Sequence, residues 1–352
     1  MTKKIAAINY GSSFHLLDHI APLAYILDVP LFVDDENCFQ KLKIFYPEVQ
    51  SHLKEDLSFR FLAKNFDALF SCNPWFSEDK FSFNTLHNKN MQLIFCPHGN
   101  SDKGHIDKVN MFCYTMQDAV LLYGSHMIDL LKTLNVYKHL KKSKVIGNFR
   151  LQYYQKFKKF YDDLLNALVF SKLNSDNKTI LYAPTWKDNE NSTSFFKIFE
   201  NLIKTVPSNY NLIIKLHPNL EKKHPTEFYQ IYETNLPSNI LLIEDLPLIY
   251  PLLNKCDIYL GDFSSIGYDF LYFKKPMFFL DPFDRDQKKD PSLSLFKCGK
   301  QIDKKYWNNI FFFIERNLNF NSLKNIQKKT YEYAFGKERS INQIKDIALQ
   351  TC

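Results

Sequence analysis

The sequence predicts an α/β protein built from two doubly wound parallel-sheet units in tandem. Short apolar runs bounded by turn residues alternate with longer amphipathic stretches, a pattern typical of parallel sheets covered by helices. The alternation is interrupted by a polar, aromatic, helical stretch at 151–178 and then begins again. A chain of 352 residues with 45% hydrophobic content also exceeds what one core usually fills. We therefore expect domains at 1–160 and 161–352, and leave open whether a C-terminal helix packs back on the first.

The apolar runs give the expected strands in chain order. In the first half they span 4–10, 30–33, 68–71, 92–97, 119–123 and 144–147. In the second half they span 179–184, 211–218, 239–245, 256–262 and 277–282. The chain has only nine glycines, and five of them closely follow expected strands: Gly11, Gly99, Gly124, Gly147 and Gly261. Because open parallel sheets bind ligands at the carboxyl ends of their strands, these loops are the expected ligand loops.

Charge and cysteine usage limit the classes of partner. Lys and Arg number 45 against 38 Asp and Glu, and the net charge of +7 is spread along the chain, which favours phosphate ligands or an anionic membrane surface. We recognise no nucleic-acid-binding module and expect no nucleic-acid partner. Seven cysteines without a CxxC pair indicate neither a disulfide framework nor a zinc site, and favour a reducing cytoplasm.

The apolar segments also bear on membrane contact. The first residues lack a secretory pattern, and no run approaches the ~20 apolar residues that span a bilayer. Any membrane contact is therefore expected to be peripheral, at the inner face of the cytoplasmic membrane.

The segment "LGDFSSIGYDF" at 260–270 places small hydroxyl residues between a buried strand and a helix. Backbone N–H groups at a helix start have no partner within the helix and suit an anion. Asp262, Ser264 and Ser265 therefore mark a phosphate-binding loop, followed by Asp269. The alternative is that one of the serines caps the helix.

Two histidines also lie at the carboxyl ends of expected strands. His98 lies in "CPHGNSDKG" with Lys103 five residues later, and His217 lies in "IIKLHPN" two residues after Lys215. An imidazole can take a proton from a hydroxyl, and a lysine can hold a phosphate. The alternative for each histidine is a hydrogen-bonded residue in a turn.

Two further strand ends carry polar groups. In "LYAPTWKD", Thr185, Trp186 and Lys187 offer a hydroxyl, an aromatic face and a cation, which suit a phosphate or a base. Trp186 is alternatively a core residue. After the first strand, Gly11, Ser12 and His15 are candidates for the acceptor side, with His15 alternatively an ordinary residue at a helix start.

Together these motifs resemble the CDP-glycerol:poly(glycerophosphate) glycerophosphotransferase family, the teichoic-acid polymerase and primase group. The segments "HGNSDK", "GNFR", "YAPTWKD" and "KLHP" and the stretch 245–282 follow the family's order. The resemblance covers roughly residues 90–345. It implies a GT-B fold, with two Rossmann-like domains facing an interdomain cleft, the acceptor side in the first domain and the nucleotide donor in the second.

The sequence departs from the family pattern in three places. Lys187 stands where the family has arginine, and lysine cannot reproduce the bidentate fork of arginine on a phosphate. Arg150 matches a family arginine and is expected to bind the phosphate of the donor, but the proline before it is absent. Near the end, Gly336 and Arg339 match a family tail weakly, and the first 90 residues are not mapped.

The resemblance implies a mechanism in which an acceptor hydroxyl attacks the distal phosphorus of a CDP-linked alcohol and CMP leaves. His98 is the expected base, and His217 with Lys215 or Lys187 is expected to stabilise charge on the diphosphate. Ser264 and Ser265 would hold phosphate. No cofactor is expected beyond the nucleotide-linked donor, and no residue pattern requires a metal. The acceptor would be a polyol phosphate, a glycan or a lipid-linked molecule.

Other functions remain open at this point. A GT-B enzyme that transfers a sugar from a nucleotide sugar would share the fold, as would a nucleotide-sugar epimerase that needs no acceptor. A catalytically inactive relative that only binds ligands is an alternative of a different class, which the altered surroundings of Arg150 and Lys187 allow.

Overall fold

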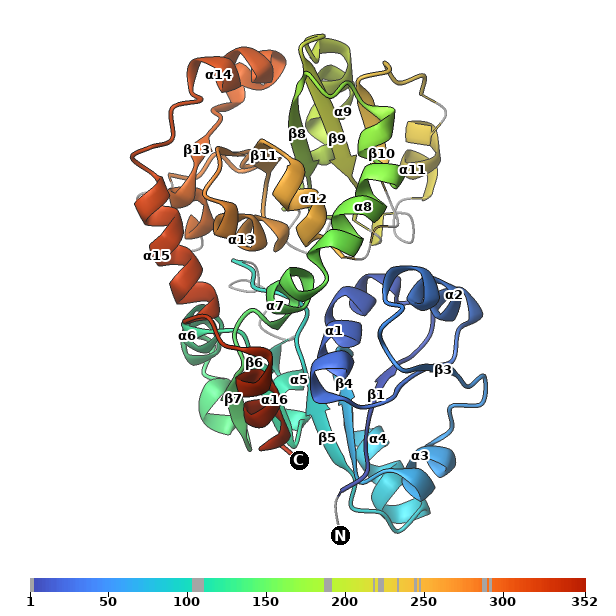
Figure 1. Ribbon diagram of the computed structural model, residues 1–352. Helices are drawn as coiled ribbons and strands as arrows, with labels where there is room; N and C mark the ends of the chain where they lie inside the picture. Colours follow the sequence, from blue (N-terminus) through green and yellow to red (C-terminus); the bar gives the residue numbers. More distant parts are fainter. Residues whose placement is uncertain are drawn as a thin grey trace. The chain divides into compact units, whose positions relative to one another are not determined.

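The computed structural model describes residues 3–102, 111–186, 192–217, 219–220, 225–232, 234–243, 246, 248–286, 290 and 293–352 (Figure 1). Its contacts divide the chain into two compact units. The first unit comprises residues 1–100, 108–156 and 333–352, and the second comprises 101–107 and 157–332. The main boundary between the units falls at 156/157, where 160/161 was expected, and the last residues of the chain return to the first unit.

The first unit is built on a seven-stranded parallel sheet in the order β3-β2-β1-β4-β5-β6-β7. Its strands are β1 (Ile5–Asn9), β2 (Leu31–Val33), β3 (Ser51–Leu53), β4 (Ala68–Ser71), β5 (Gln92–Phe95), β6 (Ala119–Leu122) and β7 (Ser143–Val145). The order reverses direction between β1 and β4, so the loops after these two strands diverge at a topological switch point.

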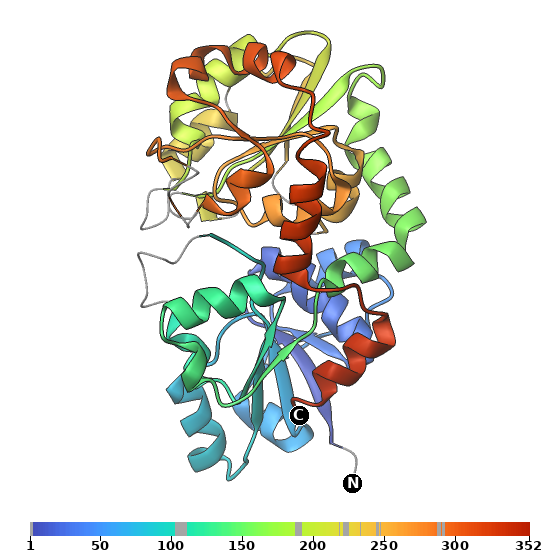
Figure 2. The ribbon, with the colours of Figure 1, turned by 90° about the vertical axis from the view of Figure 1, so that its left-hand side faces the viewer.

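The helices of the first unit alternate with its strands. They are α1 (Leu17–Leu27), α2 (Glu36–Phe45), α3 (Phe59–Asn65), α4 (Ser77–Phe81), α5 (Cys113–Met116), α6 (Ser125–Thr133), α7 (Phe149–Lys156) and α16 (Ile341–Leu349). Helix α1 packs against β1, α7 and α16, as Figures 1 and 2 show. Because of this packing, ten of its eleven residues are buried. A helix that is buried on nearly all sides forms part of the core of its domain.

The second unit repeats the same strand pattern with six parallel strands, in the order β10-β9-β8-β11-β12-β13. Its strands are β8 (Lys178–Ala183), β9 (Tyr210–Lys215), β10 (Ile240–Ile243), β11 (Ile258–Gly261), β12 (Met277–Phe279) and β13 (Lys300–Gln301). The switch point lies between β8 and β11. The predicted α/β class, with two doubly wound parallel sheets, is confirmed.

The helices of the second unit bury apolar faces on this sheet. They are α8 (Lys158–Leu168), α9 (Phe195–Thr205), α11 (Pro225–Tyr232), α12 (Tyr250–Lys255), α13 (Ile266–Phe270), α14 (Ile310–Arg316) and α15 (Lys324–Phe335), whose last three residues belong to the first unit. Helix α9 buries Phe195, Ile198, Phe199, Leu202 and Ile203, which share one face at helical spacing. Each such side chain contributes about 1.5–3 kcal/mol when fully buried.

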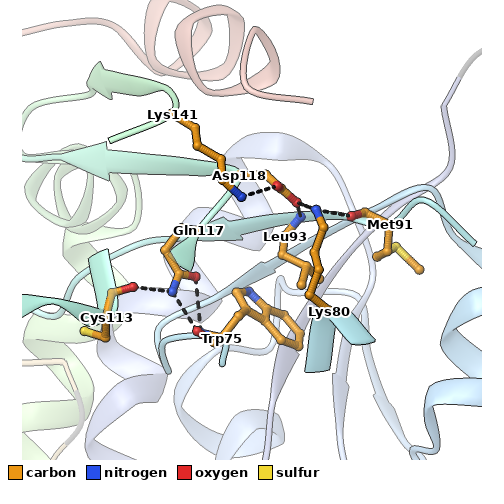
Figure 3. A network of polar contacts seen from close by, with 8 residues as sticks. All are labelled: Trp75, Lys80, Met91, Leu93, Cys113, Gln117, Asp118 and Lys141. Carbon is orange, nitrogen blue, oxygen red and sulfur yellow. Dashed lines mark hydrogen bonds and ion pairs between the residues drawn. The ribbon is translucent and has the colours of Figure 1, made fainter. Parts of the chain in front are cut away.

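A polar network closes the amino end of β5 and β6 in the first unit (Figure 3). Asp118, the residue before β6, accepts hydrogen bonds from Lys80, from Leu93 N at 3.0 Å and from Lys141 at 3.3 Å. The Gln117 amide donates to the carbonyl oxygens of Trp75 at 2.8 Å and Cys113 at 2.6 Å. These contacts join loops to strands, so structural interactions hold the amino end of the sheet. Ligands of open parallel sheets bind at the opposite end, beyond the carboxyl ends of the strands.

Candidate functional site

The buried carboxylate of Asp262 ties together the loops at the switch point of the second sheet. Asp262 directly follows β11 and is 0% exposed. Its oxygens accept hydrogen bonds from Thr185 N at 2.8 Å, from Ser194 N at 2.8 Å and from Ser194 Oγ at 2.9 Å. Thr185 comes two residues after β8, so one carboxylate fixes the chain leaving both central strands. This geometry favours a role for Asp262 in orienting the loops, and a contact of Asp262 with the donor stays a prediction.

Ser194 is a member of this network that the sequence reasoning missed. It directly precedes α9, is 0% exposed, and its hydroxyl lies 2.8 Å from Tyr182 Oη. Burial, followed by the charge of Asp262, raises the pKa of the Tyr182 phenol well above 10, so it stays protonated. The signal was available, because "STSFF" places hydroxyl residues before an amphipathic run, as at a helix start.

Packing explains the two glycines on either side of Asp262, Gly261 and Gly267. A Cβ on Gly261 would lie 2.3 Å from Tyr259 Oη, and one on Gly267 would lie 2.6 Å from Leu295 Cδ2. Ser264 is buried and Ser265 is half-buried at the N-cap of α13, where its side chain makes no capping hydrogen bond. The capping alternative is therefore wrong for Ser265, and phosphate binding by the two serines stays a prediction.

His217 and Trp186 lie close together at the carboxyl ends of β9 and β8. Their ring centroids are 6.1 Å apart, and both side chains are half-buried. His217 Nδ1 accepts a hydrogen bond from Asn219 N at 3.1 Å. In the neutral imidazole the proton is then assigned to Nε2, which makes this atom a donor. A donor suits the expected stabilisation of phosphoryl charge better than proton abstraction.

Three more predicted donor residues of the second unit have different surroundings. Lys215, the last residue of β9, is half-buried. Asp269 is 2% exposed and accepts a hydrogen bond from Tyr250 Oη at 2.6 Å, which favours a structural role. Lys187 lies outside the described residues, as does Lys103.

The first unit gathers imidazoles at the carboxyl end of its sheet. The His98 ring, exposed after β5, lies 5.9 Å from the His15 ring and 6.2 Å from the His19 ring, between centroids. His19 is buried, and its Nδ1 lies 2.7 Å from Tyr123 Oη at the end of β6. Burial, followed by the positive charge of Arg150, lowers the pKa of His19 well below 6.5. His19 is thus neutral near pH 7, beside the two more exposed histidines.

Two other predicted positions lie in the same unit. Gly11 and Ser12 are exposed after β1, and Gly11 N donates to Asp34 Oδ1 at 2.6 Å. Arg150 is instead buried, with Nη1 2.7 Å from Asp18 Oδ2 and 3% of its side chain exposed. This ion pair favours a structural role for Arg150, and phosphate binding by it stays a prediction.

The described residues also bear on metal binding and on membrane spans. No group of three or more His, Cys, Asp or Glu side chains in the described part of the chain is placed to hold a metal ion. Among the helices that the structure describes, none combines the length and apolar character needed to cross a bilayer.

Comparison with known proteins identifies the family. The sequence profile of the CDP-glycerol:poly(glycerophosphate) glycerophosphotransferases matches residues 58–289. The chain belongs to this family. The match includes His98, the Thr185 and His217 motifs and the Asp262 loop, and the earlier resemblance is therefore confirmed.

Curated relatives match this chain over part of their length. The teichoic acid glycerol-phosphate primase of Bacillus subtilis (strain 168) is 25% identical over 251 residues, which cover 66% of this chain and 62% of the primase. The teichoic acid ribitol-phosphate polymerase TarL of Staphylococcus aureus (strain NCTC 8325 / PS 47) is 33% identical over 113 residues, which cover 29% of this chain and 18% of TarL. The chain thus spans less than two thirds of the length of these curated relatives.

Solved structures confirm the GT-B-like fold. The wall teichoic acid polymerase TagF aligns with a TM-score of 0.63 at 14% identity, covering 99% of this chain and 88% of that one. MnaA of S. aureus, solved with UDP, aligns with a TM-score of 0.60 at 15% identity, covering 98% and 94%. At such identities the likeness concerns the fold alone.

Proposed function

We propose that the chain transfers a polyol-phosphate group, such as glycerophosphate, from a CDP-linked donor to an acceptor hydroxyl in the synthesis of a cell-surface polymer. Its relatives are named as primases and polymerases of glycerol phosphate and ribitol phosphate. The observation that carries the proposal is the switch point of the second sheet. There Asp262 fixes the loops after β8 and β11, and His217 presents a donor at the end of the neighbouring β9.

The proposed reaction is a substitution at phosphorus. The acceptor hydroxyl gives its proton to His98, and its oxygen forms a bond to the phosphorus that carries the polyol. The bond between this phosphorus and the oxygen it shares with CMP breaks, and CMP leaves with the electron pair. Such a reaction depends on alignment of the reactants and on donors that meet negative charge on the phosphoryl oxygens.

We assign the donor to the second unit. His217 Nε2–H would donate to a phosphoryl oxygen, with Lys215, Lys187 and Lys103 as cations. Thr185, Ser264 and Ser265 would contact phosphate, and Trp186 offers an aromatic face to the base. We assign the acceptor to the first unit, where Gly11, Ser12 and His15 lie at the same end of the sheet as His98.

The first experiment measures donor choice. The full chain is tested by thermal shift with CMP, CDP-glycerol, CDP-ribitol and UDP-N-acetylglucosamine, because a ligand that binds the folded state raises its melting temperature. We expect stabilisation by the cytidine nucleotides and CMP release from CDP-glycerol when a polyol-phosphate acceptor is added. Stabilisation by the UDP-sugar alone would support sugar transfer or epimerisation instead.

The second experiment separates an enzyme from an inactive relative. His217→Ala is expected to lower the rate of CMP release by about 10²–10³-fold, the usual effect of removing one donor to transition-state charge. If the parent chain binds cytidine nucleotides but shows no turnover with any acceptor, the proposal of a transferase fails and a binding function is favoured.

We also propose that the chain works at the inner face of the cytoplasmic membrane, by peripheral contact with anionic lipid. The net charge of +7 supports this location. Sedimentation with vesicles of phosphatidylglycerol and phosphatidylcholine would measure the contact. Equal binding to vesicles of phosphatidylcholine alone would contradict the electrostatic basis.

A further inference from the structure

Arg339 is a cation without a protein partner in the described part of the first unit. It forms neither a hydrogen bond nor an ion pair there, although its side chain is only partly exposed. Its Nη1 atom is buried and has no acceptor. A desolvated N–H without an acceptor costs free energy, and such groups in native proteins commonly mark a bound water, an ion or a functional site.

The guanidinium of Arg339 lies over a glycine at the carboxyl end of β7. Gly147 comes two residues after β7 and has a φ of +78°, which favours glycine. A Cβ at Gly147 would lie 3.1 Å from Arg339 Nη1 and 3.2 Å from Phe335 O. The missing side chain thus lets the arginine approach the loop backbone. Gly147, which Arg339 approaches, follows β7, and His98 follows β5. Because β7 is two strands from β5, these two strand ends lie roughly 10 Å apart.

Asn100 connects this corner to the loop of His98. It lies two residues after His98 and is 1% exposed, and its Nδ2 donates to Ala334 O at 3.1 Å. Ala334 directly precedes Phe335, the residue beside Gly147. Asn100 Oδ1 is buried and accepts no hydrogen bond from any residue that the structure describes. Two polar atoms of opposite kind, a donor and an acceptor, therefore lack partners around the end of α15.

We propose that Arg339 and Asn100 form a subsite for a polyol phosphate, the terminal unit of the acceptor. The guanidinium of Arg339 binds the phosphate through charge-assisted hydrogen bonds, for which its planar fork is well suited. Asn100 Oδ1 accepts a hydrogen bond from a hydroxyl of the polyol. The naming of the ligand as the acceptor rests on the proposed function, whereas the anion site itself rests on the two partnerless groups.

Its place in the first unit distinguishes this subsite from the donor positions. The donor candidates Thr185, His217 and Ser264 belong to the second unit. Arg339 lies close to Gly147, which follows β7 at the same end of the sheet as His15 and His98. A phosphate held there would bring the hydroxyl of the same polyol unit toward the candidate base.

The test measures binding without donor and without turnover. The full chain is titrated with sn-glycerol 3-phosphate, inorganic phosphate and glycerol, followed by ligand-observed NMR. We expect the parent to bind glycerol 3-phosphate more tightly than inorganic phosphate, and glycerol least. Arg339→Gln should weaken glycerol 3-phosphate binding at least tenfold, and Arg339→Lys, which keeps the charge but not the fork, about threefold.

The matched control is Lys337→Gln, which removes the same charge from an exposed residue of the same segment and should leave the affinity unchanged. Since Arg339 makes no hydrogen bond within the described chain, its variants should melt at the parent's temperature. If Arg339→Gln unfolds, Arg339→Lys still decides the question through its affinity.

Several results would overturn the proposal. Absence of glycerol 3-phosphate binding to the parent would do so, as would equal binding by parent and Arg339→Gln, which would indicate a structural water beside Arg339. Equal affinity for inorganic phosphate and glycerol 3-phosphate would overturn the role of Asn100. An inactive chain that binds glycerol 3-phosphate through Arg339 would keep the subsite while the proposed transfer fails. Conversely, a chain that catalyses the transfer and binds glycerol 3-phosphate equally well with and without the Arg339 substitutions would keep the proposed function, while the subsite proposal fails.

Discussion

The carboxyl end of the first sheet gathers imidazoles, whereas the corresponding end of the second sheet is organised by a buried carboxylate. His98 is exposed and His15 half-buried, while Asp262 is 0% exposed and holds two loops by hydrogen bonds. Both sheets nevertheless follow the same strand order around their switch points. The shared topology thus fixes where a site is built, and the residues after each strand decide its chemistry.

The difference has a consequence for mutation. Removing an exposed group at the first sheet should change the rate and leave stability nearly intact. Removing a buried group at the second sheet should first lower stability, because its partners lose their acceptors. The predictions below use this contrast, from the largest expected effect to the smallest.

His98→Ala is expected to lower the rate constant for CMP release by about 10²–10⁴-fold, the usual contribution of a general base. Its melting temperature and its affinity for CMP should stay those of the parent, because the donor candidates lie in the second unit. Single-turnover kinetics with CDP-glycerol and calorimetry with CMP measure the two effects. The control is His139→Ala, at an exposed histidine of the short 3-10 helix Tyr137–His139, which precedes β7. A fully active His98→Ala protein would contradict the assignment of the base to His98 in the first unit.

Asp262→Ala should lower the free energy of unfolding by about 3 kcal/mol or more, since buried N–H groups of Thr185 and Ser194 lose a charged acceptor. Urea unfolding followed by circular dichroism measures the change. Asp303→Ala, at an exposed carboxylate whose side chain makes no capping hydrogen bond, is the control and should change stability by less than about 0.5 kcal/mol. A loss below 1 kcal/mol for Asp262→Ala would show that the two loops hold without the carboxylate.

Acidification should destabilise the protein through His19. The pKa of His19 is lowered in the folded state, so the unfolded chain binds the additional proton below about pH 6.5. This part of the stability is present above pH 6.5 and is lost as the pH falls, by about 1.4 kcal/mol at pH 5.5. Urea midpoints at pH 7.5 and 5.5 measure it, and His19→Gln should flatten the difference while the exposed-site variant His139→Gln keeps it. An unchanged pH difference in His19→Gln would assign it to other groups.

Tyr182→Phe is expected to cost about 1 kcal/mol of stability, since it removes one buried hydrogen bond with Ser194. Tyr306→Phe is the control, because the Tyr306 hydroxyl makes no hydrogen bond within the described chain. Urea unfolding of both variants measures the difference. Equal stability of the two would mean that Asp262 alone orders Ser194.

Most of the fold could be predicted because its central strands are buried on both faces and therefore appear as apolar runs. All eleven expected strands form, with ends that shift by up to three residues. Two strands were missed, β3 and β13. Each lies at a sheet edge, and with three and two residues respectively neither contains an apolar run.

The candidate site could be predicted only in part. His98, Thr185 and Asp262 stand within three residues of the ends of their strands, so their place follows from the sheet. Ser194 was missed, and its bond to Asp262 joins residues 68 positions apart, which no local pattern reveals. Gly261 was expected to mark a ligand loop, whereas the space beside its Cα is filled by Tyr259. Such contacts depend on side chains that meet only in the folded chain.

The tie between Asp262 and both Thr185 and Ser194 bears on how the second unit folds. These hydrogen bonds join residues 77 and 68 positions apart in the chain. Contacts of such long sequence separation slow folding, because the intervening chain must close into a loop before they can form.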